Sequence, residues 1–292
     1  MKTTTILIIS ALVLSTNVYA SDIFIGHAYY FKCPYYECDA EAIYARPLFK
    51  KMLDGWQVFP NSKDIDYTPE NFKQSYTLFP NEIEWLIFNN DHSLIGKEIV
   101  ENNKPVEWLI NTGAAQMQLN PEVIRKNIDK EVDVDLTVDL ILSTNANAIF
   151  SKFKTRETTD VEIYESAIKN VRDIGNSLDP TDTIEKRAIV YSIENIDIIA
   201  ILEFEPTGKC EICEINSMVL TKVENKWEFA FDGKSINYDR DNVSFWLKTI
   251  SDFDNDGQNE YIFNLSSGIN RYGYVLWKTG MAKPLVYKYS SH

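Results

Sequence analysis

The clearest pattern in the chain lies in its C-terminal half, where short apolar runs alternate with turn residues. Asn, Gly and Asp-Gly turns separate seven such runs, which are AIVYSI, IDIIAILEFE, INSMVLTKV, KWEFAFDG, SFWLKTI, EYIFNL and GYVLW. Runs of this length that are rich in β-branched and aromatic residues are typical of strands. Residues 181–292 are therefore predicted to form a predominantly antiparallel β region.

Residues 21–180 mix strand and helix patterns. Strands are predicted for Glu84–Phe88, for Glu131–Leu142 and within IFIGHAYYFKCPYYEC, where the strand runs into a disulfide loop, because β-branched and aromatic residues or apolar–polar alternation dominate there. Helices are predicted for DAEAIYARPLFKKMLDGW, for the segment opened by Asn120-Pro121 and for Asp160–Leu178. The expected fold class is α+β, with a few helices in a mixed N-terminal part. No linker separates the two parts, so the pattern is compatible with one shared core.

The first twenty residues have the features of a secretory signal peptide. Lys2 gives a positive start, residues 6–14 form an apolar core, and Val18-Tyr19-Ala20 resembles a cleavage site before Ser21. An N-terminal membrane anchor is the alternative, but the apolar run is shorter than the ~20 residues that a span needs. No later stretch is apolar enough to cross a bilayer. The protein is expected to be exported, to the periplasm or beyond the cell.

The charge balance narrows the choice of partners. The 292 residues include 43 Asp and Glu against 29 Lys and Arg, which gives a formal net charge of −14. Such an excess of negative charge disfavours binding to nucleic acid or to an anionic membrane, because like charges repel. A protein partner is the expectation.

Four cysteines occur as two close pairs, Cys33 with Cys38 and Cys210 with Cys213. In an exported protein this spacing favours two local disulfides, although four cysteines allow three connectivities. A zinc site with four thiolate ligands is an alternative if the pairs meet in space. A redox pair at Cys210 and Cys213 is another, but the neighbouring glutamates would raise the thiol pKa.

One motif carries recognisable chemistry, the segment SDFDNDGQNEYIF at residues 251–263. Asp252, Asp254 and Asp256 alternate ahead of a glycine, and Glu260 lies eight residues after the first aspartate. Calcium prefers six to eight oxygen ligands, which closely spaced carboxylates on a tight loop supply. An EF-hand would need Glu at the twelfth position, where Phe263 stands, and helices where strands are predicted. An acidic turn that binds nothing is the alternative.

The segment resembles the Asp-rich loop of FG-GAP/VCBS-type repeats, over roughly residues 245–277. This resemblance implies a strand–calcium loop–strand hairpin, an element common in exported bacterial proteins. It also implies side-chain ligands from Asp252, Asp254, Asp256 and Glu260, with a backbone ligand from Gln258. The expected calcium ion is structural.

No catalytic residues are predicted. The three histidines, His27, His92 and His292, lie in no recognisable nucleophile context, and the sequence contains no G-x-S-x-G, H-E-x-x-H or phosphate-binding loop. A glycan hydrolase that works through two carboxylates stays open, because 43 acidic residues offer many pairs.

The remaining candidate is a binding surface. Tyr29, Tyr30, Tyr35 and Tyr36 cluster around the first cysteine pair, and aromatic clusters can act as binding hot spots, although packing explains them as well. The expected function is an exported, non-catalytic protein that recognises another macromolecule, of the periplasmic inhibitor or immunity type. The alternatives are a carboxylate-dependent glycan hydrolase and a calcium-dependent surface adhesion or sensor module.

Overall fold

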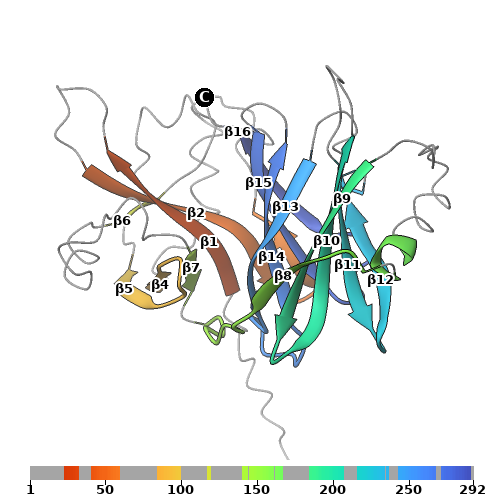
Figure 1. Cartoon of the computed structure of the whole chain (residues 1–292). Coiled ribbons are helices and arrows are strands. Elements are labelled where there is room, and N and C mark those ends of the chain that lie inside the picture. The colour runs from red at the N-terminus through yellow and green to blue at the C-terminus, as the bar shows by residue number, and fades with distance from the viewer. Residues whose placement is uncertain are drawn as a thin grey trace, which may run out of the picture.

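The fold is built almost entirely from β-strands. The computed structural model describes residues 23–32, 41–59, 84–99, 117–119, 140–143, 145–160, 162–166, 184–206, 216–233, 235–236, 243–267 and 271–290. Within these ranges, only residues 162–166 are helical. Figure 1 shows the strands arranged as layers that stack side by side.

The N-terminal layer is a seven-stranded sheet in the order β3-β2-β1-β7-β4-β5, with β6 beside β2. All its pairings are antiparallel. Its strands are β1 (Ile23–Lys32), β2 (Glu41–Met52), β3 (Gly55–Val58), β4 (Glu84–Phe88), β5 (Leu94–Ile99), β6 (Met117–Leu119) and β7 (Leu140–Ser143).

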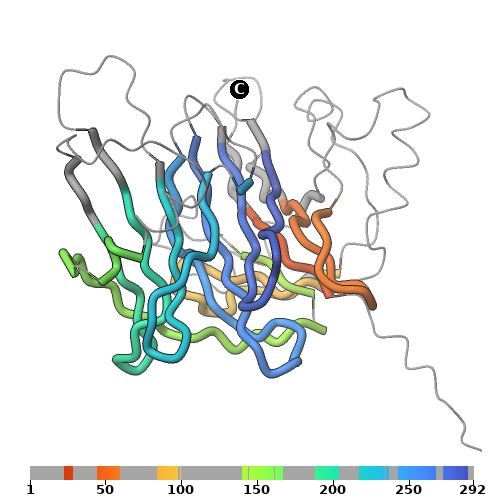
Figure 2. The backbone as a smooth tube through the Cα atoms, turned by 90° about the vertical axis from the view of Figure 1, so that its right-hand side faces the viewer, coloured from red at the N-terminus to blue at the C-terminus, as the bar shows by residue number. Residues whose placement is uncertain are grey.

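The C-terminal strands form two antiparallel groups. The first comprises β8 (Lys154–Thr158), β9 (Ile184–Ile193), β10 (Ile196–Pro206), β11 (Asn216–Val223) and β12 (Lys226–Asp232). The second comprises β13 (Val243–Ser251), β14 (Glu260–Ser267), β15 (Arg271–Lys278) and β16 (Leu285–Ser290). A single parallel pairing, Asn216 with Val243, connects the two groups into one nine-stranded sheet. In Figure 2, the turns β9–β10, β11–β12 and β13–β14 lie together at the lower end of the molecule.

Three hydrophobic clusters among the described residues pack against these layers. The group β13–β16 lies in the middle, and alternate residues of β14 point to opposite cores: Tyr261 and Phe263 pack towards β9–β12, whereas Ile262 packs towards the N-terminal sheet. The third core lies on the other face of β9–β12, where Ile163 of the short helix packs. Since β14 is buried on both faces, its residues 261–263 are consecutive apolar positions.

The α+β fold class predicted from the sequence is wrong for the described residues, which are all-β apart from one short helix. The clearest error lies in DAEAIYARPLFKKMLDGW, which forms the hairpin of β2 and β3 instead of a helix. Burial explains the difference, because Ala45, Leu48 and Phe49 are at most 1% exposed and tertiary packing overrides weak helix propensity. Pro47 is accommodated beside a bulge, where the β1–β2 register shifts.

The other element predictions have mixed outcomes. The seven C-terminal strands, the first strand and Glu84–Phe88 are confirmed. Of the predicted helix Asp160–Leu178, the structure describes residues 160 and 162–166, of which 162–166 are helical; of the strand Glu131–Leu142 it describes the last three residues. The helix predicted after Asn120-Pro121 and the signal peptide at residues 1–20 lie outside the described residues.

The parts of the chain on either side of the boundary expected near residue 180 pack against each other. The core between the N-terminal sheet and β14–β16 joins Phe49 and Leu142 with Ile262 and Leu276. In the described ranges, no helix has the length and apolar character needed to span a membrane.

Candidate metal centre

The Asp-rich segment forms the connection between β13 and β14, closed at the pair Ser251 and Glu260. The Asp252 carboxylate shapes this loop by accepting the backbone N–H groups of Asp256 at 3.0 Å and Gly257 at 2.8 Å. Gly257 has φ 88° and Asn255 φ 56°, left-handed conformations that these two residue types tolerate best. The Asp-Asn-Asp-Gly order therefore specifies the turn.

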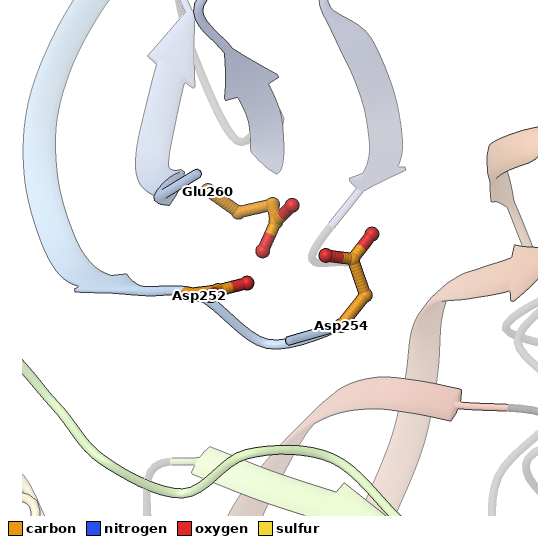
Figure 3. Close-up of side chains that lie close together, drawn as sticks. All are labelled: Asp252, Asp254 and Glu260. Carbon is orange, nitrogen blue, oxygen red and sulfur yellow. The ribbon is translucent and has the colours of Figure 1, made fainter. Parts of the chain in front are cut away.

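Three of the predicted ligands converge. Ligand oxygens of Asp252, Asp254 and Glu260 lie within 4.8 Å of one another, and their carboxylates point towards a common space (Figure 3). Asp256 is not part of this group: one of its oxygens accepts the N–H of Gln258 and the other accepts a hydrogen bond from Lys278 at 2.5 Å. The Gln258 residue is exposed.

Two lysines approach the carboxylates. The Lys278 ammonium lies 2.7 Å from Glu260 Oε1, 2.5 Å from Asp256 Oδ2 and 3.5 Å from Asp254 Oδ1. It comes from β15, where the register places it directly opposite Glu260. Lys51 comes from β2 in the N-terminal sheet and forms an ion pair with Asp254. The loop is therefore tied to the adjacent strand β15 of its own sheet and to a different layer.

Glu260 is the most deeply buried of the acidic residues, with 0% of its surface exposed. Its Oε1 accepts hydrogen bonds from Lys278 and from the indole Nε1 of Trp56 at 3.2 Å, and its Oε2 accepts the N–H of Phe253 at 2.8 Å. Trp56 lies in β3, so this carboxylate also connects the central group to the N-terminal sheet. Three donors compensate for the cost of burying the charge.

Electrostatics at the site follow from these contacts. Burial alone would lower the pKa of Lys278, but the hydrogen bonds to Asp256 and Glu260 raise it above its ordinary value, so the ammonium stays charged. Burial raises the pKa of the Glu260 carboxyl, and the hydrogen bond from Lys278 opposes that rise. The same lysine holds the pKa of Asp256 below its ordinary value.

The donor set fits calcium in chemistry, because it consists of carboxylate oxygens on a tight loop. One oxygen in particular accepts no hydrogen bond from the part of the chain that the structure describes, although the Lys278 ammonium lies 3.5 Å from it. Asp254 has a side chain only 3% exposed, and within the described residues its buried Oδ1 accepts no hydrogen bond. A buried carboxylate oxygen without a donor is unfavourable, and a cation in the space it faces would remove that cost.

The other residues predicted to be functional lie elsewhere in the fold or fall outside the described residues. Tyr29 and Tyr30 lie in β1, whereas Tyr35 and Tyr36 lie outside the described residues. The four cysteines, Cys33, Cys38, Cys210 and Cys213, lie outside them as well. His92 lies in the β4–β5 turn and stacks on Phe150, with ring centroids 4.5 Å apart.

Sequence reasoning missed Lys51, Trp56, Lys278 and the anchoring role of Phe253. Phe253 lies between two of the aspartates, is 0% exposed and packs in the core shared with the N-terminal sheet. The position of Lys278 could have been found, because pairing EYIFNL with GYVLW places it opposite Glu260. Lys51 and Trp56 left no signal, because they lie 203 and 204 residues from their partners.

Comparison with known proteins adds no further constraint. No protein-family model, curated protein or solved structure matches the chain.

Proposed function

We propose that the chain is an exported, non-catalytic binding protein of the inhibitor or immunity type, and that its Asp252–Glu260 loop is a structural calcium site. The observation that carries this proposal is the direction in which the acidic groups point. Glu260 and Asp254 contact Trp56 and Lys51 of the N-terminal sheet and are almost completely buried. Carboxylates in such positions stabilise a scaffold but do not reach a substrate.

The charges at the loop support a divalent cation. Four carboxylates, those of Asp252, Asp254, Asp256 and Glu260, face two ammonium groups within the described contacts. Two negative charges are left over, and this excess of negative charge favours binding of a divalent cation. Asp252, Asp254 and Glu260 would hold the ion, which would fix the loop between the layers.

We expect calcium to stabilise the protein moderately. Extracellular calcium modules bind at about 10⁻⁴–10⁻³ M, so 10 mM calcium should add about 1.4–2.7 kcal/mol to the free energy of unfolding. Asp252→Asn should abolish that increment. Asp91→Asn, an exposed turn position on β4–β5, is the matched control and should keep it. Thermal unfolding with calcium or with a chelator measures the difference, and an equal increment in both variants would contradict the site.

The binding function is tested by affinity capture on residues 21–292 from source-cell extract and secreted fractions, with and without a chelator. We expect one stoichiometric protein to be retained in both conditions, because the ion is structural. A net charge of −14 favours a basic partner. If that protein is a hydrolase, its activity should fall when an equimolar amount of the chain is added. Retention of no protein would refute a tight inhibitor of proteins in those fractions.

A calcium-dependent surface module is the second candidate, and exposed apolar residues beside the loop support it. Leu53 is 98% exposed, two residues after the Lys51 that contacts Asp254. Ile149 is 76% exposed, and its carbonyl accepts a hydrogen bond from Ser251 at the base of the loop. A partner retained with calcium but lost with chelator would favour this function over the inhibitor.

A further inference from the structure

We infer that Lys278 is a built-in cation of the Asp-rich loop, so that the loop closes on the lysine ammonium when calcium is absent, and calcium enters by displacing it. This inference rests on the proposed calcium site and deepens it. It concerns how the affinity of the site is set, and the following contacts carry it.

The Lys278 ammonium lies within the cluster of carboxylates. It lies 2.5–3.5 Å from oxygens of Asp254, Asp256 and Glu260, and Asp254 and Glu260 belong to the group whose oxygens would hold an ion. Its side chain is only 10% exposed, so it lies among the carboxylates and not at their rim. A calcium ion bound by the same oxygens would lie within a few ångströms of this ammonium, and the two positive charges would repel strongly.

Lys278 satisfies the hydrogen-bonding capacity of the carboxylates only in part. It donates hydrogen bonds to Glu260 and Asp256, but the Asp254 Oδ1 at 3.5 Å accepts none within the described residues. Ligand oxygens of Asp254, Asp252 and Glu260 nevertheless lie within 4.8 Å of one another. The ammonium therefore holds the loop together while leaving part of the ligand set for a competing ion.

Lys51 differs from Lys278 in its exposure and in the number of its ion pairs. Lys51 also pairs with Asp254, but its side chain is 28% exposed and it comes from another sheet. Among the four acidic residues it forms a described ion pair with Asp254 alone, whereas Lys278 contacts three. Removing either lysine changes the net charge near the loop by the same amount. Only Lys278→Met frees several ligand oxygens at once.

The test measures terbium binding by luminescence excited through tryptophan, and then its displacement by calcium. Trp56 donates a hydrogen bond to Glu260 and is therefore placed to sensitise a bound terbium ion. Lys278→Met should bind both ions at least about tenfold more tightly than the unmodified chain. Lys51→Met should gain clearly less, and Lys278→Arg, which keeps the charge, should gain nothing.

A second readout follows folding by circular dichroism in chelator. Lys278→Met should unfold at lower temperature than the unmodified chain without calcium, because the loop has lost its internal cation. If Lys278→Met does not fold, Lys278→Gln, whose amide can still donate to Glu260, replaces it in both measurements.

The outcomes separate this inference from the calcium site itself. Unchanged or weaker affinity in Lys278→Met, or an equal gain in Lys51→Met, overturns the inference while the unmodified chain still binds calcium. Binding by neither the unmodified chain nor the variant overturns both. Tighter binding in Lys278→Met alone, with lower stability in chelator, supports the inference.

Discussion

Replacing Glu260 by leucine should destabilise the protein by about 3–5 kcal/mol in the presence of a chelator. The substitution places an apolar side chain of similar size in a position that is 0% exposed. It leaves the Nε1 of Trp56 and the N–H of Phe253 without their acceptor, and it removes the carboxylate directly opposite Lys278. The chelator ensures that the loss reflects these contacts and not a lost ion.

Urea unfolding followed by tryptophan fluorescence measures this loss, and Glu260→Gln is the matched control. The glutamine keeps the shape and an acceptor oxygen but not the charge, so it should lose less, about 1–3 kcal/mol. A Glu260→Leu variant within about 1 kcal/mol of the unmodified chain would mean that these hydrogen bonds do not hold the layers together.

This prediction indicates why the loop matters for function. A binding protein without a catalytic site needs a rigid framework to present its surface. The loop contributes by joining the β13–β14 hairpin to β2 and β3 through Lys51 and Trp56. Loss of Lys51, of Lys278 or of a bound ion should therefore loosen the connection between the layers as well as the local turn.

The C-terminal strands could be predicted because their local sequence carries the full signal. EYIFNL and GYVLW are buried on both faces, so they read as apolar runs bounded by turns. Strand β8, with the sequence KTRET, was missed because it is polar and mostly exposed, and only its pairing with β9 defines it. Strand β16 was missed as well, although its sequence LVYKYS has strand-forming residues.

The N-terminal fold could not be predicted in the same way. Residues 41–52 contain Ala, Leu, Lys and Met, which favour helices locally. They form a strand because β1, β3 and β6 all pair with it, and these partners are not visible in the local pattern. Pairing across long sequence separations decides the structure here, which is why the helix prediction was wrong.

The candidate site shows the same division between local and distant signals. The acidic residues were found from their spacing, since a tight turn needs only its own residues. The groups that complete the site, Lys51 and Trp56, come from the other end of the chain. Their contribution follows from the packing of whole sheets, and no short motif encodes it.

Replacing Phe253 by alanine should destabilise the protein by about 3–5 kcal/mol, because it removes a large ring from a fully buried position. The ring packs in the core between the N-terminal sheet and β14–β16, 6.3 Å from the ring of Phe150. The Phe253 carbonyl also accepts the N–H of Asn147. Phe253 thus anchors the Asp-rich loop to this core.

The same substitution should weaken terbium binding, because Phe253 lies between Asp252 and Asp254 and fixes their relative positions. Phe253→Leu is the control, since it keeps most of the apolar volume and should cost less than about 1.5 kcal/mol with little change in affinity. Urea unfolding in chelator and terbium luminescence measure the two effects separately. Lower stability with unchanged terbium affinity would show that the ligands hold their positions without this anchor, and that the loop geometry depends only on its own hydrogen bonds.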